Sequence, residues 1–190
     1  ADLAVLAARV AAVAPGLVVE EVPVPGPPTS PDLRGAGWAE AAVVLAALAA
    51  RRGGGTGPGV PVEVAGPQGG RARVIVAPGG EVAVEVWAGE ILDAPTLRSY
   101  CIGAVHQALG WVRREGVAVD AGGEVRDLTI RSFGILPARD MPPVEVVLHA
   151  SPLWPVNGSD AVFAATAAAA WLADGLAPEW PTRRGQRGAP

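Results

Sequence analysis

Apolar residues recur along the chain with two different periods, and the period separates expected helices from expected strands. Leucine and valine at positions 3, 6, 10 and 13 follow helical spacing, whereas valine alternates with glutamate and alanine over residues 81–87. The same criteria predict helices over 3–14, 38–52, 94–115 and 161–172. They predict strands over 17–22, 60–65, 71–77, 81–87, 117–120, 124–130 and 144–149.

Glycine and proline mark the loops between these elements. Residues 23–37 hold five prolines and three glycines and predict a loop, and residues 53–59 form a break between possible lobes 1–52 and 60–178. Strands separated by helices, with hairpins in the middle, indicate an α+β domain over 1–178, in which about four helices pack on mixed or antiparallel sheet segments. The polar, basic residues 179–190 are expected to be a disordered tail.

Composition narrows the functional classes. The formal net charge of -4 offers no basic surface for nucleic acid, and the longest apolar run, 161–173, is too short to span a bilayer. Cys101 is the only cysteine, so no disulfide can form within the chain and no Cys-x-x-Cys pair can hold an iron–sulfur cluster. A cytoplasmic protein without nucleic-acid or membrane partners is therefore expected.

Three segments in the second half carry the most specific pattern. They read LRSYCIGAVHQALGWVRREGVAVD from position 97, DLTIRSFGILPARDMPPVEVVL from 127 and PVNGSDAVFAATAAAAW from 155. In this order and spacing they resemble the last part of the molybdopterin-binding subunit of the xanthine dehydrogenase, aldehyde oxidase and CO dehydrogenase family. Residues 130–146 match a segment that follows a strand and a turn in that family, and residues 157–172 match its glycine-rich loop and alanine-rich helix. The resemblance implies a fold like the family's second molybdopterin-binding domain.

The same resemblance implies a function. The chain would be the C-terminal portion or a subunit of a molybdenum-dependent oxidoreductase, inactive alone, because the family's other glycine-rich loops are missing from this sequence. An upstream molybdenum-binding chain would share the molybdopterin, and iron–sulfur and FAD subunits would carry the electrons, with neither group on this chain. The alternative is a degenerate, non-catalytic relative that acts as an assembly or interaction module.

Asp160 lies where the family has its catalytic glutamate, so the resemblance makes it a general base. Asn157, Gly158 and Ser159 precede it in a loop whose backbone N–H groups could face the anionic cofactor. Aspartate is one methylene shorter than glutamate. A second interpretation stays open, in which Ser159 or Asp160 only caps the last helix.

Two further positions are tied to the cofactor by the resemblance. Gly35 and Gly37 would allow close backbone approach to a ligand, although a tight start to the following helix explains them equally. His106 and Gln107 lie on a helix that packs near the cofactor in the family, and Gln107 is the predicted contact. No cysteine or second histidine accompanies His149, so no metal site is expected there.

Overall fold

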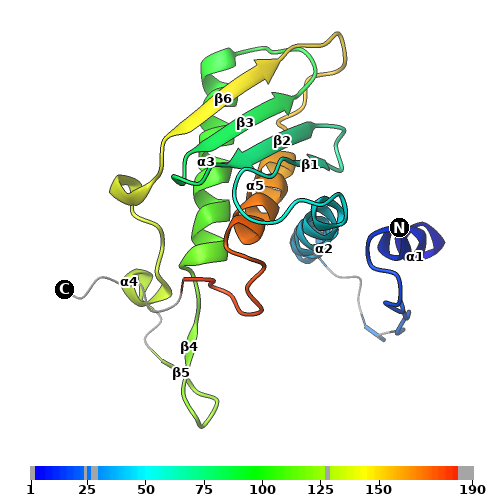
Figure 1. The fold of residues 1–190 in the computed structure, drawn as a ribbon, viewed down its shortest axis with the longest axis vertical. Helices are drawn as coiled ribbons and strands as arrows, with labels where there is room; N and C mark the ends of the chain where they lie inside the picture. The colour runs from blue at the N-terminus through cyan, green and yellow to red at the C-terminus, as the bar shows by residue number, and fades with distance from the viewer. Residues whose placement is uncertain (1–2, 24, 27–29, 127–128, 184–190) are drawn as a thin grey trace.

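A mixed four-stranded sheet forms the centre of the fold (Figure 1). The computed structural model describes residues 3–23, 25–26, 30–126 and 129–183. The strand order is β1-β2-β3-β6, where β1–β3 are antiparallel and β6 runs parallel to β3. The strands are β1 (Val62–Ala65), β2 (Arg71–Val76), β3 (Val82–Trp87) and β6 (Val144–His149).

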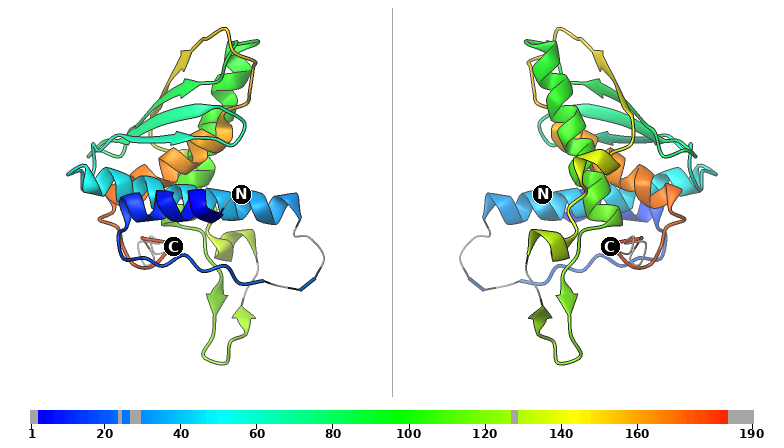
Figure 2. Two further views of the ribbon diagram at one scale, coloured as in Figure 1. Left: turned by 90° about the vertical axis from the view of Figure 1, so that its right-hand side faces the viewer. Right: turned by 90° about the vertical axis from the view of Figure 1, so that its left-hand side faces the viewer.

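Three long helices cover one face of this sheet, so the domain has two layers (Figure 2). They are α2 (Pro31–Arg52), α3 (Ala94–Arg113) and α5 (Ser159–Ala173). A fourth, α1 (Leu3–Val13), contacts α2, where Arg52 donates a hydrogen bond to the carbonyl of Ala12. The predicted α+β class, with a mixed sheet and about four helices, is confirmed. Among the described residues, none of the helices combines the length and apolar character needed to cross a bilayer.

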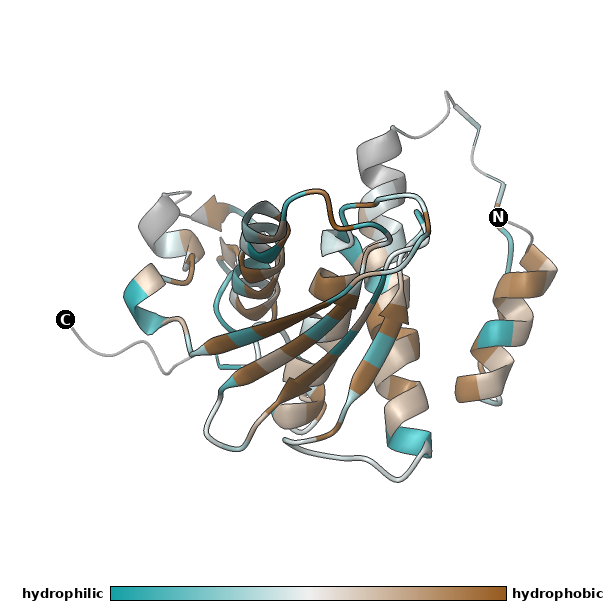
Figure 3. Ribbon diagram, turned by 90° about the horizontal axis from the view of Figure 1, so that it is seen from above, coloured by the Kyte–Doolittle hydropathy of each residue, from teal (hydrophilic) through white to brown (hydrophobic). Residues whose placement is uncertain are grey.

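Apolar and polar residues alternate along the strands (Figure 3), and the valines at the alternate positions are buried. Val62, Val74, Val84 and Val146 are successive partners across all four strands, and each is buried. This row removes apolar surface from water along the whole width of the sheet. The pattern that predicted the strands therefore also determines which face packs.

Helix α5 lies at the centre of the helical layer and contacts α2, α3, β1 and β2. Its buried residues are mostly alanine, and they lie on every side of the helix. A helix that is apolar all round is buried all round, and its small side chains let neighbouring backbones approach closely. The alanine-rich helix α5 therefore packs both against the sheet and against the neighbouring helices.

Thr166 is the exception in the interior of α5. Its hydroxyl is fully buried and has no hydrogen-bond partner within the described part of the chain. Valine has nearly the same shape, so Thr166→Val is expected to raise the free energy of unfolding by about 1 kcal/mol, measured by urea denaturation. Thr182→Val is the control, because the Thr182 hydroxyl donates to Asp174 at 2.7 Å and its loss should destabilise. Destabilisation by Thr166→Val would contradict the assignment of an unsatisfied hydroxyl.

Several predicted boundaries are wrong. Residues 17–22 form no strand, since no described segment pairs with them. Helix α2 begins at Pro31 and not at Trp38, because proline is accepted in the first helical turn. In the place of the strands predicted over 117–120 and 124–130, the described residues form a short hairpin of β4 (Ala118–Val119) and β5 (Val125–Arg126). A capping box at Thr129 and Ser132 then starts α4 (Ile130–Phe133), followed by the 3-10 helix η1 (Ala138–Asp140).

The chain after α5 turns back onto the helices as far as Arg183. Trp180 packs edge-on against Trp111 and Trp171, at ring-centroid distances of 4.8 and 5.7 Å. The backbone N–H of Thr182 donates to the Val112 carbonyl at 2.8 Å. Residues 179–183 belong to the predicted tail over 179–190, and Trp180 and Thr182 make these contacts with the helices. Residues 184–190 of the predicted tail lie outside the described residues.

Candidate functional site

A cavity of about 530 Å³ lies where α2, α3, the β1–β2 turn and the start of α5 meet. Four of the predicted site residues line it: Gly35, Gln107, Ser159 and Asp160. They come from three helices and are separated by up to 125 positions in the sequence. The remaining lining residues are Trp38, Ala39, Pro67, Gln68, Ser99, Tyr100, Gly103, Ala104 and Phe163.

The start of α5 is formed by its preceding loop and not by a side-chain cap. Gly158 is the N-cap residue, with a φ of 70° that favours glycine, and Asn157 accepts a hydrogen bond from the Ser159 N–H at 3.0 Å. The prediction that Ser159 or Asp160 caps the helix is therefore wrong. Both residues lie inside the first turn, and this turn places them at the cavity wall.

Asp160 is held between its own helix and the β1–β2 turn. Its Oδ1 accepts a hydrogen bond from the Ala161 N–H at 2.7 Å. A Cβ atom at Gly66 would lie 2.6 Å from Asp160 Oδ2, so a larger residue there would displace the carboxylate from this position. Asp160 is the one charged side chain among the described residues that line the cavity. The carboxylate can accept a hydrogen bond, or a proton, from a bound molecule.

The other predicted site residues do not share this cavity. Gly37 is not among its lining residues. Gly158 is buried, and a Cβ atom there would lie 3.2 Å from Val86 Cγ2. Asn157 lines a second pocket, described below. Asn157 and Gly158 therefore belong to the loop before α5, and Gly37 lies in α2 outside the cavity lining.

Three polar residues that share the cavity with Asp160 were not predicted from the sequence. Gln68 comes from the β1–β2 turn, and Ser99 and Tyr100 come from α3. Ser99, Gly103 and Gln107 are spaced by four residues, which places them on one face of α3. That repeat of small and polar residues on an otherwise apolar helix was the available signal.

The two histidines and the cysteine are not among the lining residues of this cavity. His106 Nε2 lies 2.6 Å from the Leu136 carbonyl oxygen. His149 stacks on Trp87 and lies 3.1 Å from Glu85 Oε2. Burial raises the pKa of the Cys101 thiol to about 11, so it is an unreactive core residue. In the part of the chain that the structure describes, no group of three or more His, Cys, Asp or Glu side chains could hold a metal ion.

Comparison with known proteins gives limited matches. No protein-family model and no curated protein matches the sequence. Among solved structures, CO dehydrogenase from Oligotropha carboxidovorans aligns with a TM-score of 0.47 and 12% identity, over 55% of this chain and 15% of that chain. A carbon monoxide-reduced Cu,Mo-CO dehydrogenase gives a TM-score of 0.44 and 11% identity, over 60% of this chain and 16% of that chain.

Quinoline 2-oxidoreductase from Pseudomonas putida 86 gives a TM-score of 0.43 and 19% identity, over 59% of this chain and 15% of that chain. The matched part thus spans about one sixth of the length of these enzymes. Each TM-score lies below 0.5, so the function of this chain has to be argued from its own residues.

Proposed function

We propose that this chain is the C-terminal portion or a subunit of a molybdenum-dependent hydroxylase and forms one wall of a molybdopterin site shared with a partner chain. The observation that carries the proposal is the convergence of Gly35, Gln107, Ser159 and Asp160 on one cavity. The family resemblance had already selected these four residues from distant parts of the sequence.

The cavity fits part of the cofactor. Gln68 and Gln107 offer amide donors and acceptors, and Ser99 and Ser159 offer hydroxyls, which suits the mixed hydrogen-bonding edge of a pterin ring. The volume of about 530 Å³ lies in the range of small-ligand sites. No described lining residue is cationic, so the charge that balances the cofactor phosphate would come from the partner chain.

Asp160 is proposed as the general base. Bound cofactor would supply the oxidising metal centre, while this chain orients the carboxylate through the Ala161 N–H and the space left by Gly66. The carboxylate would take a proton from the oxygen nucleophile as it attacks substrate. The upstream molybdenum-binding chain and the iron–sulfur and FAD subunits remain proposed partners.

A second candidate function is a non-catalytic assembly or interaction module. It is favoured by the hydrogen bond from the Ala161 N–H to Asp160, which gives the carboxylate a structural task at the start of α5. The two candidate functions predict different molybdenum and pterin contents for the assembled complex. They also predict different effects of removing the Asp160 charge on the oxidation rate.

The test is co-expression of this chain with the product of the gene immediately upstream, followed by measurement of molybdenum and pterin in the purified complex. The hydroxylase proposal expects near-stoichiometric metal, and Asp160→Asn should retain the metal while oxidation slows about a hundredfold or more. Glu145→Gln, an exposed carboxylate of β6, is the matched control and should leave the rate unchanged. A stable complex without metal, or full activity of Asp160→Asn, would favour the interaction module.

A further inference from the structure

A second pocket, of about 500 Å³, lies beside the start of α3 and shares Gln68 and Tyr100 with the first cavity. Trp154 and Tyr100 contribute its aromatic surface, and Leu97 and Val156 contribute its apolar surface. Trp154 is 85% exposed, the largest exposed fraction of the aromatic side chains in the described residues. A tryptophan held in water over a pocket marks a surface where a ligand can cover it.

The backbone fixes Trp154 in this position. The Glu90 N–H donates to the Leu153 carbonyl at 2.9 Å, and the Val156 N–H donates to the Ala88 carbonyl at 2.9 Å. Trp154 is therefore bracketed by two hydrogen bonds to the segment that follows β3. Because the backbone is already anchored, ligand binding would have to order only the side chain of Trp154.

The charged residues that line this pocket are all acidic. Glu90 and Asp93 are its charged lining residues, and none of the described lining residues is cationic. Hydrogen bonds from Thr96 keep the pKa of the Asp93 carboxyl below its ordinary value, so it is ionised at neutral pH. Two carboxylates beside two aromatic rings favour a positively charged ligand.

We propose that this pocket binds a small organic cation, specifically an alkylated ammonium group that rests on Trp154. Alkyl groups reduce the hydration of the nitrogen and contact Leu97 and Val156, while the indole and the carboxylates attract its charge. A metal ion is a poorer match, because the pocket offers two carboxylates among mainly apolar and aromatic side chains.

The proposal is tested by titrating the purified chain with choline and following the indole N–H resonances of its six tryptophans by NMR. Loss of one resonance in Trp154→Phe assigns the Trp154 signal. We expect choline to shift that signal and to bind about tenfold more tightly than 3,3-dimethylbutan-1-ol, its neutral carbon analogue. Equal affinity for both, or no shift with choline, would overturn the proposal.

Charge variants test the carboxylates separately from folding. Asp93→Asn keeps an N-cap side chain on α3 and removes the charge, and Glu90→Gln removes the second charge. Each is expected to weaken choline binding severalfold while leaving the affinity for the neutral alcohol unchanged. Glu145→Gln is the control with an unrelated carboxylate. If the pocket variants and the control bind choline equally, the assignment of a cation site is wrong.

Discussion

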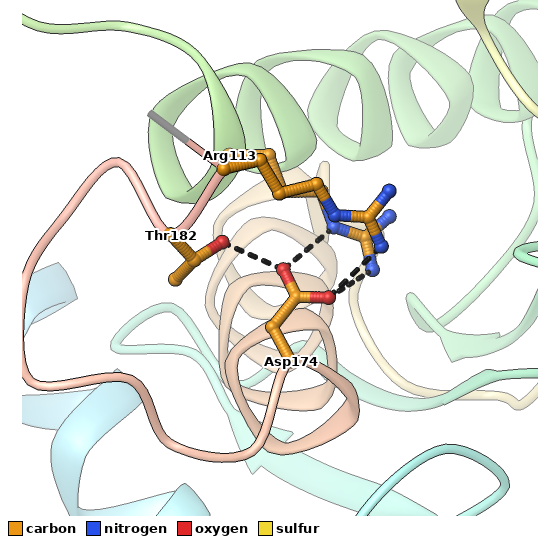
Figure 4. Close-up of polar contacts among 4 residues, drawn as sticks. Arg113, Asp174 and Thr182 are labelled. Atoms are coloured by element: carbon orange, nitrogen blue, oxygen red, sulfur yellow. Dashed lines mark hydrogen bonds and ion pairs between the residues drawn. The ribbon is translucent and has the colours of Figure 1, made fainter. Parts of the chain in front are cut away.

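Asp174→Ala is expected to lower the free energy of unfolding by about 3–5 kcal/mol, because it leaves a buried guanidinium unpaired. Arg113 contacts Asp174 through Nε at 3.0 Å, and their side chains are only 10% and 8% exposed. Thr182 and Arg183 also donate hydrogen bonds to the same carboxylate (Figure 4). Loss of the carboxylate therefore removes the side-chain hydrogen bonds through which Asp174 joins the end of α3 to the C-terminal segment.

Urea denaturation measures this change, with Glu63→Ala as the matched control. Glu63 pairs with Arg71 at 3.0 Å, but both side chains are close to half exposed, so its loss should cost at most about 1 kcal/mol. The double variant Arg113→Met with Asp174→Leu should recover much of the stability, since no buried charge then remains. An Asp174→Ala protein as stable as the control variant would refute the anchoring role.

The same cluster predicts sensitivity to acid. Burial opposes ionisation of Asp174, but hydrogen bonds from Thr182 and Arg113, the charge of Arg113 and the hydrogen bond from Arg183 outweigh it, so its pKa lies below the ordinary value of 3.8. A lowered pKa in the folded state stabilises the protein above the unfolded-state value, and this contribution is lost as pH falls through the folded value. Asp174→Asn should remove that part of the decline in stability below about pH 4.

Gly89→Ala is expected to cost about 3 kcal/mol or more in unfolding free energy. Gly89 has a φ of 75°, and a Cβ atom there would lie 2.2 Å from the Trp154 carbonyl oxygen. Backbone strain and a backbone clash therefore act together. Neither residues 88–90 nor residues 151–156 can move away without breaking the hydrogen bonds between these two segments.

Gly80→Ala separates the two contributions. Gly80 has a φ of 97°, but a Cβ atom there meets nothing within 4 Å, so only backbone strain of about 1 kcal/mol is expected. Thermal and urea unfolding of both variants give the comparison. Similar losses for Gly89→Ala and Gly80→Ala would show that residues 151–156 do not press against Gly89.

The spacing of apolar residues along the sequence was enough to predict much of the secondary structure. Alternation over 81–87 identified β3 and its buried face, and helical spacing located α3 and α5, because these patterns depend on residues a few positions apart. Asp160 and Ser159 were selected by the family resemblance, which matched their loop and the helix that follows it. Their proposed roles remain predictions.

Contacts between distant segments were decided only by the tertiary structure. Packing of α2 and α3 on α5 brings Gly35 and Gln107 to Asp160, and parallel pairing places β6 beside β3. The β-type pattern at 17–22 formed no strand, since a strand needs a paired neighbour that its own residues cannot supply. The contact of Trp180 with Trp111 likewise joins residues far apart in the sequence, so the pattern around Trp180 could not predict it.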